Sequence, residues 1–296
     1  MTRPLVSVMM PCYNTERSLS MALASLQAQS YENWEALVVD DGSTDGTWAI
    51  LEACVDPRVR RERFPENRGR GAARQRCLEM ARGELLSFLD SDDWLFPGKL
   101  ECQVALMSEH PEFIALGGAC VITDANGAPV GIDCLGAAPG KSLTIRRFTR
   151  PGPPPLNFTS CMVRMDAARA SGFNPVFRRA QDKDFMIRLL LGREYGISLT
   201  LVYAYSQAEA ASLAKTLEAY RYRIKIYSQY LTSYPLSSLW DIGLTIARIA
   251  VYRAASLLNA EHRLIGMRWS ALTPEARHAY EDARAQVLSR CAGRPA

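Results

Sequence analysis

The chain has 296 residues, of which 48% are hydrophobic and 22% are charged, and its net charge is +4. This composition excludes a mainly disordered, collagen-like or coiled-coil chain, and the excess of positive charge is too small to indicate nucleic acid as a partner. Only three histidines occur, none of them in the first hundred residues, which argues against a Ser-His-Asp triad or a His-rich zinc site.

The first hundred residues alternate between strand and helix patterns. Short apolar runs predict buried strands at 5–10, 35–39, 59–64 and 84–89. Pro11 is expected to end the first strand. Helical spacing predicts helices at 15–29, 44–54 and 69–82, and Gly83 stands where a C-cap glycine is expected. Strands separated by helices of this length indicate βαβ units, so the predicted fold class is α/β, with a mostly parallel sheet flanked by helices.

The pattern after residue 97 is less regular and ends in helices. We expect helices at 97–109 and 181–191, strands at 115–123, 158–165 and 198–205, and a turn at Asn126-Gly127. From residue 213 the strand patterns stop, and helices are predicted at 213–231, 236–258 and 274–288. We therefore expect a first domain over 1–212, with halves at 1–100 and 101–212, and a C-terminal helical region over 213–296.

Two of the predicted strands end in acidic residues, at 40–41 and at 90–93. In open α/β sheets ligands bind outside the carboxyl ends of the strands, and clustered carboxylates without histidine suit a hard cation such as Mg²⁺ or Mn²⁺. The alternative is that such residues cap the following helices, which we prefer for Asp45. Between the two acidic segments, a glycine-containing loop at 66–74 carries Arg and opens a helix, an arrangement that favours phosphate.

With these motifs the chain resembles family 2 glycosyltransferases, which have the GT-A fold. The matching segments are 6–14, 26–31, 34–35, 38–47, 81–84 and 88–94, together with Asn67, Gly69 and Arg74. A second stretch also fits, at 160–165, 172–173 and 181–185. The resemblance implies an inverting enzyme that uses a nucleotide-sugar, with 1–100 as its nucleotide-binding half and 101–212 as its acceptor half.

The resemblance also assigns nucleotide-binding roles in the first half. Tyr13 would lie against the base, and Asp41 would hydrogen-bond that base, most plausibly uracil, while Asp40 would support the strand end. Arg74 would hold the diphosphate side of the site, close to Asp90. The other residues that the resemblance places in the nucleotide site are Pro11, Asn14, Asn67 and Ser91.

Three further roles concern the chemistry. Residues 90–92 would be the DxD motif, with Asp92 the direct ligand of Mn²⁺ or Mg²⁺ on the diphosphate. Asp182 would be the catalytic base, because a sugar hydroxyl is a poor nucleophile until a carboxylate takes its proton; Asp184 is the rival base. The chain departs from the family at Gln181, where Glu is common, and at 205–209, where many members carry a His near the diphosphate and this chain has none.

No Gln-x-x-Arg-Trp motif occurs, so we expect a non-processive enzyme that adds a single sugar to a glycan or lipid-linked glycan acceptor of a surface polysaccharide, lipopolysaccharide or glycolipid. Two alternatives stay open. The first is a catalytically inactive homologue with a binding or scaffold role, against which Asp41, Asp92 and Asp182 argue. The second is a sugar nucleotidyltransferase, which would need a Gly-rich loop where this chain has residues 11–14.

Five arginines are candidates for an acceptor site that binds an acidic glycan or a lipid phosphate; the alternative is a solvated surface. They are Arg146, Arg147, Arg150, Arg178 and Arg179. Eight scattered cysteines, with no signal peptide or membrane span, predict a cytoplasmic protein. A peripheral contact with the inner face of a membrane and a homodimer are open additions to this expectation.

The predicted helix at 236–258 has polar and apolar faces. Ser238, Asp241, Thr245 and Arg248 share one face of it. The apolar remainder can pack on the catalytic core, lie on a membrane or dimerise, and we favour packing on the core. We also expect the region after residue 213 to carry no catalytic residue.

Overall fold

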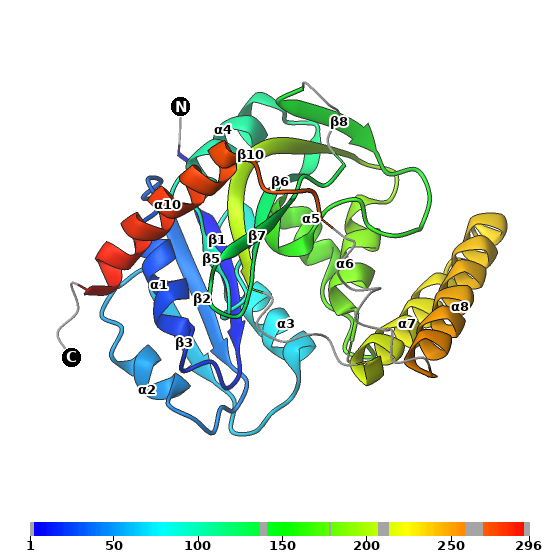
Figure 1. The fold of residues 1–296 in the computed structure, drawn as a ribbon, viewed down its shortest axis with the longest axis horizontal. Helices are drawn as coiled ribbons and strands as arrows, with labels where there is room; N and C mark the ends of the chain where they lie inside the picture. The colour runs from blue at the N-terminus through cyan, green and yellow to red at the C-terminus, as the bar shows by residue number, and fades with distance from the viewer. Residues whose placement is uncertain (1–2, 137–140, 178, 207–212, 258–268, 293–296) are drawn as a thin grey trace.

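The computed structural model describes residues 3–136, 141–177, 179–206, 213–257 and 269–292 (Figure 1). The strands are β1 (Val6–Cys12), β2 (Trp34–Asp40), β3 (Val59–Arg63), β4 (Leu85–Phe88), β5 (Trp94–Leu95), β6 (Phe113–Thr123), β7 (Pro129–Asp133), β8 (Leu143–Arg147), β9 (Met162–Arg164) and β10 (Glu194–Ser206). The helices are α1 (Leu19–Gln27), α2 (Thr47–Glu52), α3 (Arg70–Met80), α4 (Lys99–Glu109), α5 (Met165–Ser171), α6 (Gln181–Leu190), α7 (Leu213–Ser228), α8 (Pro235–Leu257) and α10 (Pro274–Ala292), with a 3₁₀ turn, η1, at Phe158–Ser160.

All of these strands join one sheet in the order β3-β2-β1-β4-β9-β6-β10-β5, with β7 beside β6 and β8 beside β10. Strands β1, β2, β3 and β4 pair in parallel, as the alternation of strands and helices predicts. Beyond β4 the sheet is mixed, because β9 runs antiparallel to both β4 and β6, while β6 and β10 are parallel. The α/β class is thus confirmed, and parallel pairing holds among β1, β2, β3 and β4, whereas β5 pairs antiparallel with β10.

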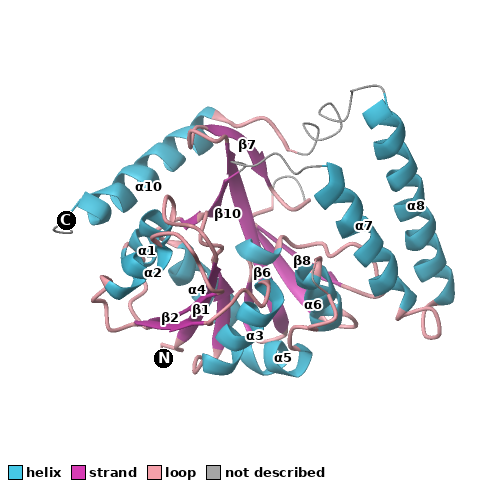
Figure 2. Cartoon of the chain, turned by 90° about the horizontal axis from the view of Figure 1, so that it is seen from below, coloured by secondary structure: helices cyan, strands magenta, loops and turns pink. Residues whose placement is uncertain are grey.

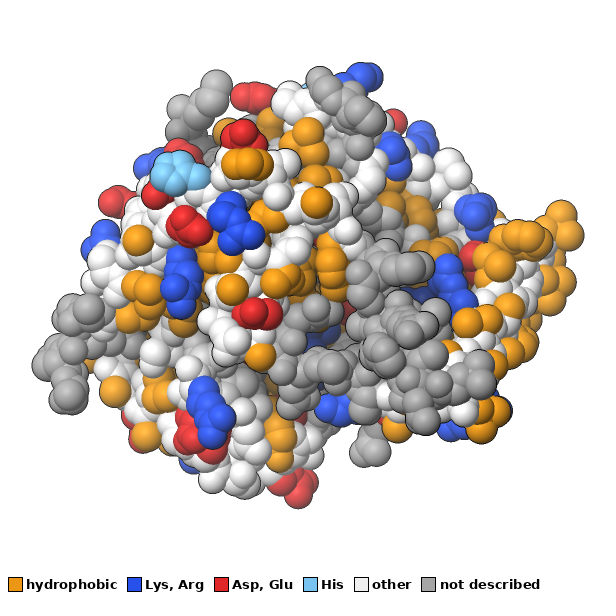
Figure 3. All heavy atoms as spheres, in the orientation of Figure 1, with side chains coloured by type: hydrophobic (Ala, Val, Ile, Leu, Met, Phe, Trp, Pro, Cys, Tyr) orange, Lys and Arg blue, Asp and Glu red, His pale blue; other side chains and the backbone are white. Residues whose placement is uncertain are grey.

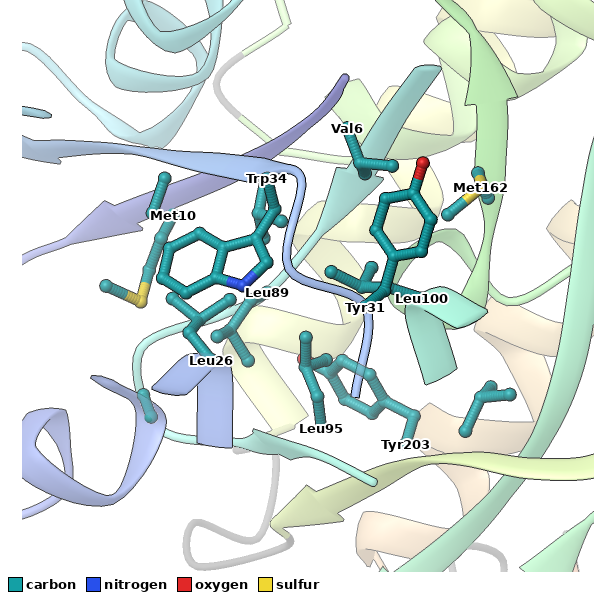
Figure 4. Packing of buried hydrophobic residues seen from close by; sticks show 14 of the residues in the cluster. Val6, Met10, Leu26, Tyr31, Trp34, Leu89, Leu95, Leu100, Met162 and Tyr203 are labelled. Atoms are coloured by element: carbon teal, nitrogen blue, oxygen red, sulfur yellow. The ribbon is translucent and has the colours of Figure 1, made fainter. Parts of the chain in front are cut away.

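Helices cover both faces of the sheet (Figures 1 and 2). Side chains of β1 alternate between the faces, because successive residues of a strand point to opposite sides. Val8 and Met10 pack in a cluster with Leu23 of α1 and Leu100 of α4, part of which Figure 4 shows. Met9 lies in a second cluster, with residues of α3, α5 and α6. The eight cysteines all lie in the described part of the chain and are thiols, five of them buried.

Three local expectations were wrong. Residues 158–160, expected in a strand at 158–165, form the 3₁₀ turn η1, and the strand there is Met162–Arg164. Strand β1 does not stop at Pro11 but runs to Cys12, where it still pairs with β2. Its pairing with β4 ends at Met9, so the missing N–H of proline leaves no ladder bond unmade there. Gly83 is not a C-cap, because α3 ends at Met80 and Ala81 is already extended. Gly83 instead allows a close approach, since a Cβ there would lie 2.5 Å from the carbonyl oxygen of Leu5.

The helices after residue 213 pack in two separate places (Figures 1 and 2). The α7–α8 hairpin docks beside α6, where Ile226 and Tyr227 bury against Phe177 and Ile187. Helix α10 instead runs along α1, and Tyr280 stacks near Trp94 at a ring distance of 5.3 Å. None of the described helices is long and apolar enough to cross a bilayer.

The packing of α8 overturns the favoured expectation for its apolar face. Ser238, Asp241 and Thr245 are at most 5% exposed, so this polar face points toward the protein. Arg248, which shares that face by helical spacing, is exposed at its edge. Tyr252 is buried and Ile242 is partly buried, but most of the large apolar residues of the helix are exposed.

Candidate active site

The candidate site lies at the carboxyl ends of β1, β2 and β4. The chain passes from β1 to β2 and β3 on one side, and then returns to β4 on the other side of β1. Strand order therefore reverses next to β1, and ligands of open α/β sheets bind at such a point, outside the carboxyl ends of the strands. The sequence-predicted residues of the first half lie at the ends of β1 and β2, on the loops that follow β1, β2, β3 and β4, and at the start of α3.

The loop after β1 is fastened to the loop after β2. Asn14 adopts a left-handed conformation with φ of 52°, which Asn tolerates better than most residues. Its backbone N–H donates to the Ser43 hydroxyl at 2.9 Å, and its side-chain oxygen accepts from the Thr44 N–H at 2.8 Å. Pro11 is buried in β1, whereas Tyr13 is 44% exposed beyond its end, so the Tyr13 ring is open to a ligand.

Asp40 and Asp41, at the end of β2, have different hydrogen-bond partners. Asp40 is fully buried; it accepts hydrogen bonds from the backbone N–H and hydroxyl of Ser43, and Arg63 Nε lies 3.2 Å from its Oδ2. Asp41 accepts hydrogen bonds from the backbone N–H groups of Arg68 and Gly69, at 2.7 and 2.9 Å. Burial raises the pKa of Asp41, and these two bonds oppose the rise. Asp41 thus fixes the glycine-containing loop against β2.

The same loop is held close by Gly42, whose φ is +73°. A Cβ at Gly42 would lie 2.6 Å from the carbonyl carbon of Glu66, so a larger residue would push the loop away. Asn67 is exposed on this loop. The structure therefore presents Asn67 to solvent beside the strand ends.

An ion pair joins the start of α3 to the end of β4. Arg74 is 3% exposed and donates from Nη2 to Asp90 Oδ1 at 3.0 Å, and its guanidinium stacks 4.5 Å from the Phe158 ring centre. Burial acts to raise the pKa of Asp90, but the charges of Arg74 and Arg70 outweigh it and hold that pKa below its ordinary value. Asp90 is therefore a carboxylate at neutral pH.

The carboxylates of the acidic segment after β4 differ in burial and in their hydrogen bonds. Asp93 is buried, and it accepts hydrogen bonds from the Tyr203 hydroxyl at 2.8 Å and from the Ser206 N–H at 2.7 Å. Ser91 is also buried, and its backbone carbonyl accepts a hydrogen bond from the Ser18 hydroxyl at 2.9 Å. Burial and the neighbouring charges of Asp92 and Asp90 raise the pKa of Asp93 well above its ordinary value. Asp92, in contrast, is exposed.

These carboxylates are suitable ligands for a divalent cation. One oxygen each of Asp90, Asp92 and Asp93 lie within 4.8 Å of one another. Because Asp93 is 2% exposed and both of its oxygens accept hydrogen bonds from β10, Asp90 and Asp92 are the more accessible carboxylates for a cation. Two hard oxygen ligands at a phosphate site are typical of Mg²⁺ or Mn²⁺, which complete their coordination with substrate phosphate and water.

Asp182 and Asp184, the two candidate bases, stand in different surroundings on α6. Asp184 is fully buried and accepts from Arg188 Nη2 at 2.6 Å, and Arg188 in turn donates to the carbonyl of Gly172. Asp182 is half-buried in the first turn. The geometry thus leaves Asp182 accessible and commits Asp184 to an internal ion pair.

Arg70 connects the two halves of the site. It begins α3, and its Nη1 lies 3.9 Å from Asp90 Oδ2. The nearby charge of Asp90 is the largest cause of the raised pKa of Arg70, and the charges of Asp92 and Asp182 add to it. The start of α6 lies beside the start of α3, since a Cβ at Gly71 would be 3.9 Å from Cγ of Gln181, the residue before Asp182.

The predicted arginine cluster is divided among several partners. Arg150 Nη1 pairs with Asp241 of α8 at 3.1 Å, and Arg179 Nε pairs with Glu218 of α7 at 2.7 Å, so both hold the α7–α8 hairpin. Arg146 and Arg147 donate to the backbone carbonyls of Gly136 and Gly192. Arg178 lies outside the described residues, as does the stretch 207–209 where a His was absent.

Sequence reasoning missed Tyr203, which is fully buried on β10. Its hydroxyl accepts from the Asp90 N–H at 3.1 Å and donates to Asp93, so it fixes the DxD segment from the far half of the sheet. No local pattern marks such a residue, since Tyr203 and Asp90 are more than a hundred positions apart.

The glycosyl transferase family 2 model matches residues 7–171, which is more than half of the chain, so the chain belongs to this family. The "Putative glycosyltransferase EpsE" of Bacillus subtilis is 34% identical over 191 residues, covering 62% of this chain and 66% of that protein. The UDP-Glc:alpha-D-GlcNAc-diphosphoundecaprenol beta-1,3-glucosyltransferase WfgD of Escherichia coli is 41% identical over 106 residues, covering 36% and 42%. The chain thus spans under two thirds of the length of these relatives.

Two solved structures share the fold. S. aureus TarS 1–349 in complex with UDP has a TM-score of 0.63 at 20% identity, covering 97% of this chain and 88% of that one. The mannosyltransferase PcManGT from Pyrobaculum calidifontis, in complex with GDP-Man and Mn²⁺, has a TM-score of 0.59 at 20% identity, covering 99% and 87%. These similarities show the GT-A fold.

Proposed function

We propose that the protein is an inverting, metal-dependent, non-processive glycosyltransferase. It moves a single sugar from a nucleotide-sugar, which we assign as a UDP-sugar, to a hydroxyl of a glycan or lipid-linked glycan. The observation that carries the proposal is the approach of the start of α6, which carries Asp182, to the start of α3, where Arg70 lies 3.9 Å from Asp90, at the point where strand order reverses. This approach supports a site that would combine the cation ligands Asp90 and Asp92 with a candidate base.

On the donor side, the exposed Tyr13 ring offers a stacking surface for the base, and Asp41 stands at the neighbouring strand end. The two hydrogen bonds that Asp41 accepts use one lone pair of each oxygen, and a carboxylate has about four acceptor sites. Asp41 can therefore hold the loop and also accept a hydrogen bond from an imide N–H, such as that of uracil.

Asp90 and Asp92 would hold the Mn²⁺ or Mg²⁺ that accompanies the diphosphate. When bound, the cation offsets the negative charge that develops on the departing nucleoside diphosphate. Arg70 would place a second positive charge on the same side, and the buried Arg74 keeps Asp90 ionised and oriented.

Transfer itself would proceed by direct displacement. The acceptor hydroxyl attacks the anomeric carbon as its proton passes to the carboxylate of Asp182. A new C–O bond forms to the acceptor, and the bond between the anomeric carbon and the diphosphate oxygen breaks, so the nucleoside diphosphate leaves with the electron pair. Attack opposite the leaving group inverts the anomeric configuration.

The acceptor side of the proposal rests on similarity. The printed name of WfgD specifies a lipid-diphosphate-linked sugar as acceptor, and that of another relative, TuaG of Bacillus subtilis, which is 42% identical over 110 residues, refers to teichuronic acid biosynthesis. We therefore propose a role at the cytoplasmic face of a membrane in surface-polysaccharide synthesis.

The test is a donor screen with UDP-, GDP- and dTDP-sugars in the presence of Mn²⁺, with released nucleotide as the readout. We expect release from one UDP-sugar above all others, loss of release on chelation of the metal, and no release by Asp92→Asn. For a productive donor and acceptor, the proton NMR coupling of the new anomeric centre then shows whether configuration is inverted.

Release from none of the donors by the folded protein would contradict the proposal and favour the inactive homologue. Preference for a GDP-sugar would contradict the assignment of Asp41 to uracil. Retention of configuration would contradict the role of Asp182 as a base in direct displacement.

A further inference from the structure

The outward face of α8 is unusual for a helix of a globular protein. Such helices bury an apolar stripe and expose a polar one, but α8 buries Ser238, Asp241 and Thr245 against the rest of the chain. Its large exposed apolar residues are Leu236, Leu239, Trp240, Leu244, Ile246, Val251 and Leu257, with exposed fractions from 39% to 86%. In Figures 1 and 2, α8 is the outermost element, with α7 between it and the sheet.

The inverted orientation is fixed by specific contacts. Asp241 pairs with Arg150, and the carboxylate side of this pair is 5% exposed. The Tyr252 ring is buried against Tyr220 of α7, with ring centres 5.7 Å apart. Rotating α8 to bury its apolar face would break the first contact and leave a charge unpaired, so the outward stripe is a property of the fold.

The exposed stripe is continuous and is bordered by positive charge. With about 100° between successive helical residues, the exposed apolar side chains lie on one side of the helix, and Arg248 and Arg253 stand at its two edges, both exposed. The α7–α8 hairpin contains six Lys or Arg residues and two acids. Both acids, Glu218 and Asp241, are paired with arginines of the main body.

Figure 3 shows hydrophobic side chains gathered on the region that α8 occupies, with Lys and Arg side chains close by. An apolar helical face between cations, with Trp240 64% exposed on it, is the pattern of helices that lie in the interface of an anionic bilayer. Each Lys or Arg near such a surface adds to the attraction. A helix of this composition lies in the membrane plane and does not cross it.

A second copy of the chain fits this surface less well. An anionic bilayer offers phosphates to the cations along both edges of the stripe, whereas a second copy presents the same cations again. A two-fold pairing of α8 would also bring the arginines of one copy toward those of the other, with no exposed acid on either helix to compensate.

We propose that the outward face of α8 docks the protein on the surface of an anionic phospholipid bilayer. The stripe enters the headgroup region, and Arg248 and Arg253 contact lipid phosphates on either side. This inference stands on the α7–α8 hairpin alone and holds whether or not the site at the strand ends transfers sugar.

The test is co-sedimentation of the full chain with phosphatidylcholine vesicles, with and without phosphatidylglycerol. Leu239→Ser/Trp240→Ser/Val251→Ser removes apolar contacts, and we expect it to lower the partition coefficient on the order of a hundredfold. Arg248→Glu/Arg253→Glu should lower binding to the anionic vesicles by on the order of tenfold or more, with little effect on the neutral ones. All of the substituted side chains are solvent-exposed, so the fold should persist.

Matched controls change equivalent residues elsewhere. Val55→Ser/Val176→Ser removes two exposed valines, and Arg284→Glu/Arg290→Glu reverses two exposed charges on α10; both should bind vesicles as the original chain does. Absence of vesicle binding by the original chain, or unchanged binding by the triple serine variant, would overturn the proposal. A lipid-free dimer that the triple serine variant disperses would overturn it in favour of a second copy.

Discussion

Substitution of the two neighbouring carboxylates of α6 separates catalysis from stability. Asp182 is half-buried, so Asp182→Asn should change the free energy of unfolding by less than about 0.5 kcal/mol. Loss of the proton acceptor should lower transfer by on the order of 10²–10⁴-fold, with donor affinity almost unchanged. Asp184→Asn should do the reverse, because Asp184 is fully buried beside Arg188.

The magnitude for Asp184→Asn follows from its contacts. Arg188 Nη2 and Nε lie 2.6 and 3.0 Å from Asp184 Oδ2, and Arg188 is 28% exposed, so part of its charge stays solvated. Loss of a charged partner inside a protein costs about 3–5 kcal/mol, and we reduce this to about 2–3 kcal/mol for the exposed part of Arg188. At about 2–4 °C per kcal/mol, the melting temperature should fall by roughly 4–12 °C.

The assay combines thermal unfolding with initial rates of transfer for both variants. The expected pattern is a stable, inactive Asp182→Asn and an unstable Asp184→Asn that retains transfer at temperatures where it is folded. A stable Asp184→Asn with no transfer, together with an active Asp182→Asn, would refute the assignment of the base and the structural role given to Asp184.

Two further predictions concern Tyr203, beside the acidic segment, and Glu35, at the amino end of β2. Tyr203→Phe leaves the Asp90 N–H without its partner and removes the hydroxyl that donates to Asp93. It should therefore lower the free energy of unfolding in urea by about 1–3 kcal/mol and weaken Mn²⁺-dependent UDP binding. If neither quantity changes, Tyr203 does not fix the DxD segment. Burial opposes ionisation of Glu35, but hydrogen bonds from Arg60, Ser7 and the Arg82 N–H outweigh it and hold its pKa below the ordinary 4.5. The stability that Glu35 contributes is therefore complete above that value and is lost as pH falls through its lower folded-state pKa. Urea unfolding from neutral pH to about pH 3 should show a smaller acid-induced loss for Glu35→Gln, and equal slopes would contradict this role.

The parts of the fold and site that the sequence predicts depend on local signals. The strands β1, β2 and β4 are short apolar runs, and acids follow β2 and β4 directly. Because parallel strands place their carboxyl ends at one edge, these acids had to lie near one another once the alternation of strands and helices was recognised. The family motifs covered the same segments, so the first hundred residues were the most predictable part.

Contacts between distant segments could not be predicted from the sequence. Strand β5 has two residues and exists because it pairs with β10, and β8 depends on the same partner. Gly83 stands in the sequence where a helix cap is expected, but glycine is needed there because the backbone of Leu5, just before β1, comes close to it. Tyr203 acts on Asp93 across 110 positions, and no spacing rule links such residues.

The orientation of α8 shows a second limit of prediction from the sequence. Helical spacing correctly groups Ser238, Asp241 and Thr245 on one face, but it does not say which face points inward. The deciding partner is Arg150, which lies 91 residues before Asp241. The ion pair between the buried Asp241 and the half-exposed Arg150 therefore opposes the usual rule that the apolar face of a helix points inward.

The central claim is that the acidic segment after β4 binds a nucleoside diphosphate through a divalent cation. The most direct measurement is titration of UDP into the chain with and without Mn²⁺, for the original sequence, for Asp92→Asn and for Asp282→Asn, an exposed acid on α10. We expect Mn²⁺ to strengthen UDP binding to the original chain and to Asp282→Asn. The gain should fall by on the order of tenfold or more in Asp92→Asn, since even indirect contacts at metal sites have effects of that size. An equal gain from Mn²⁺ in Asp92→Asn, or no gain in the original chain, would contradict the account.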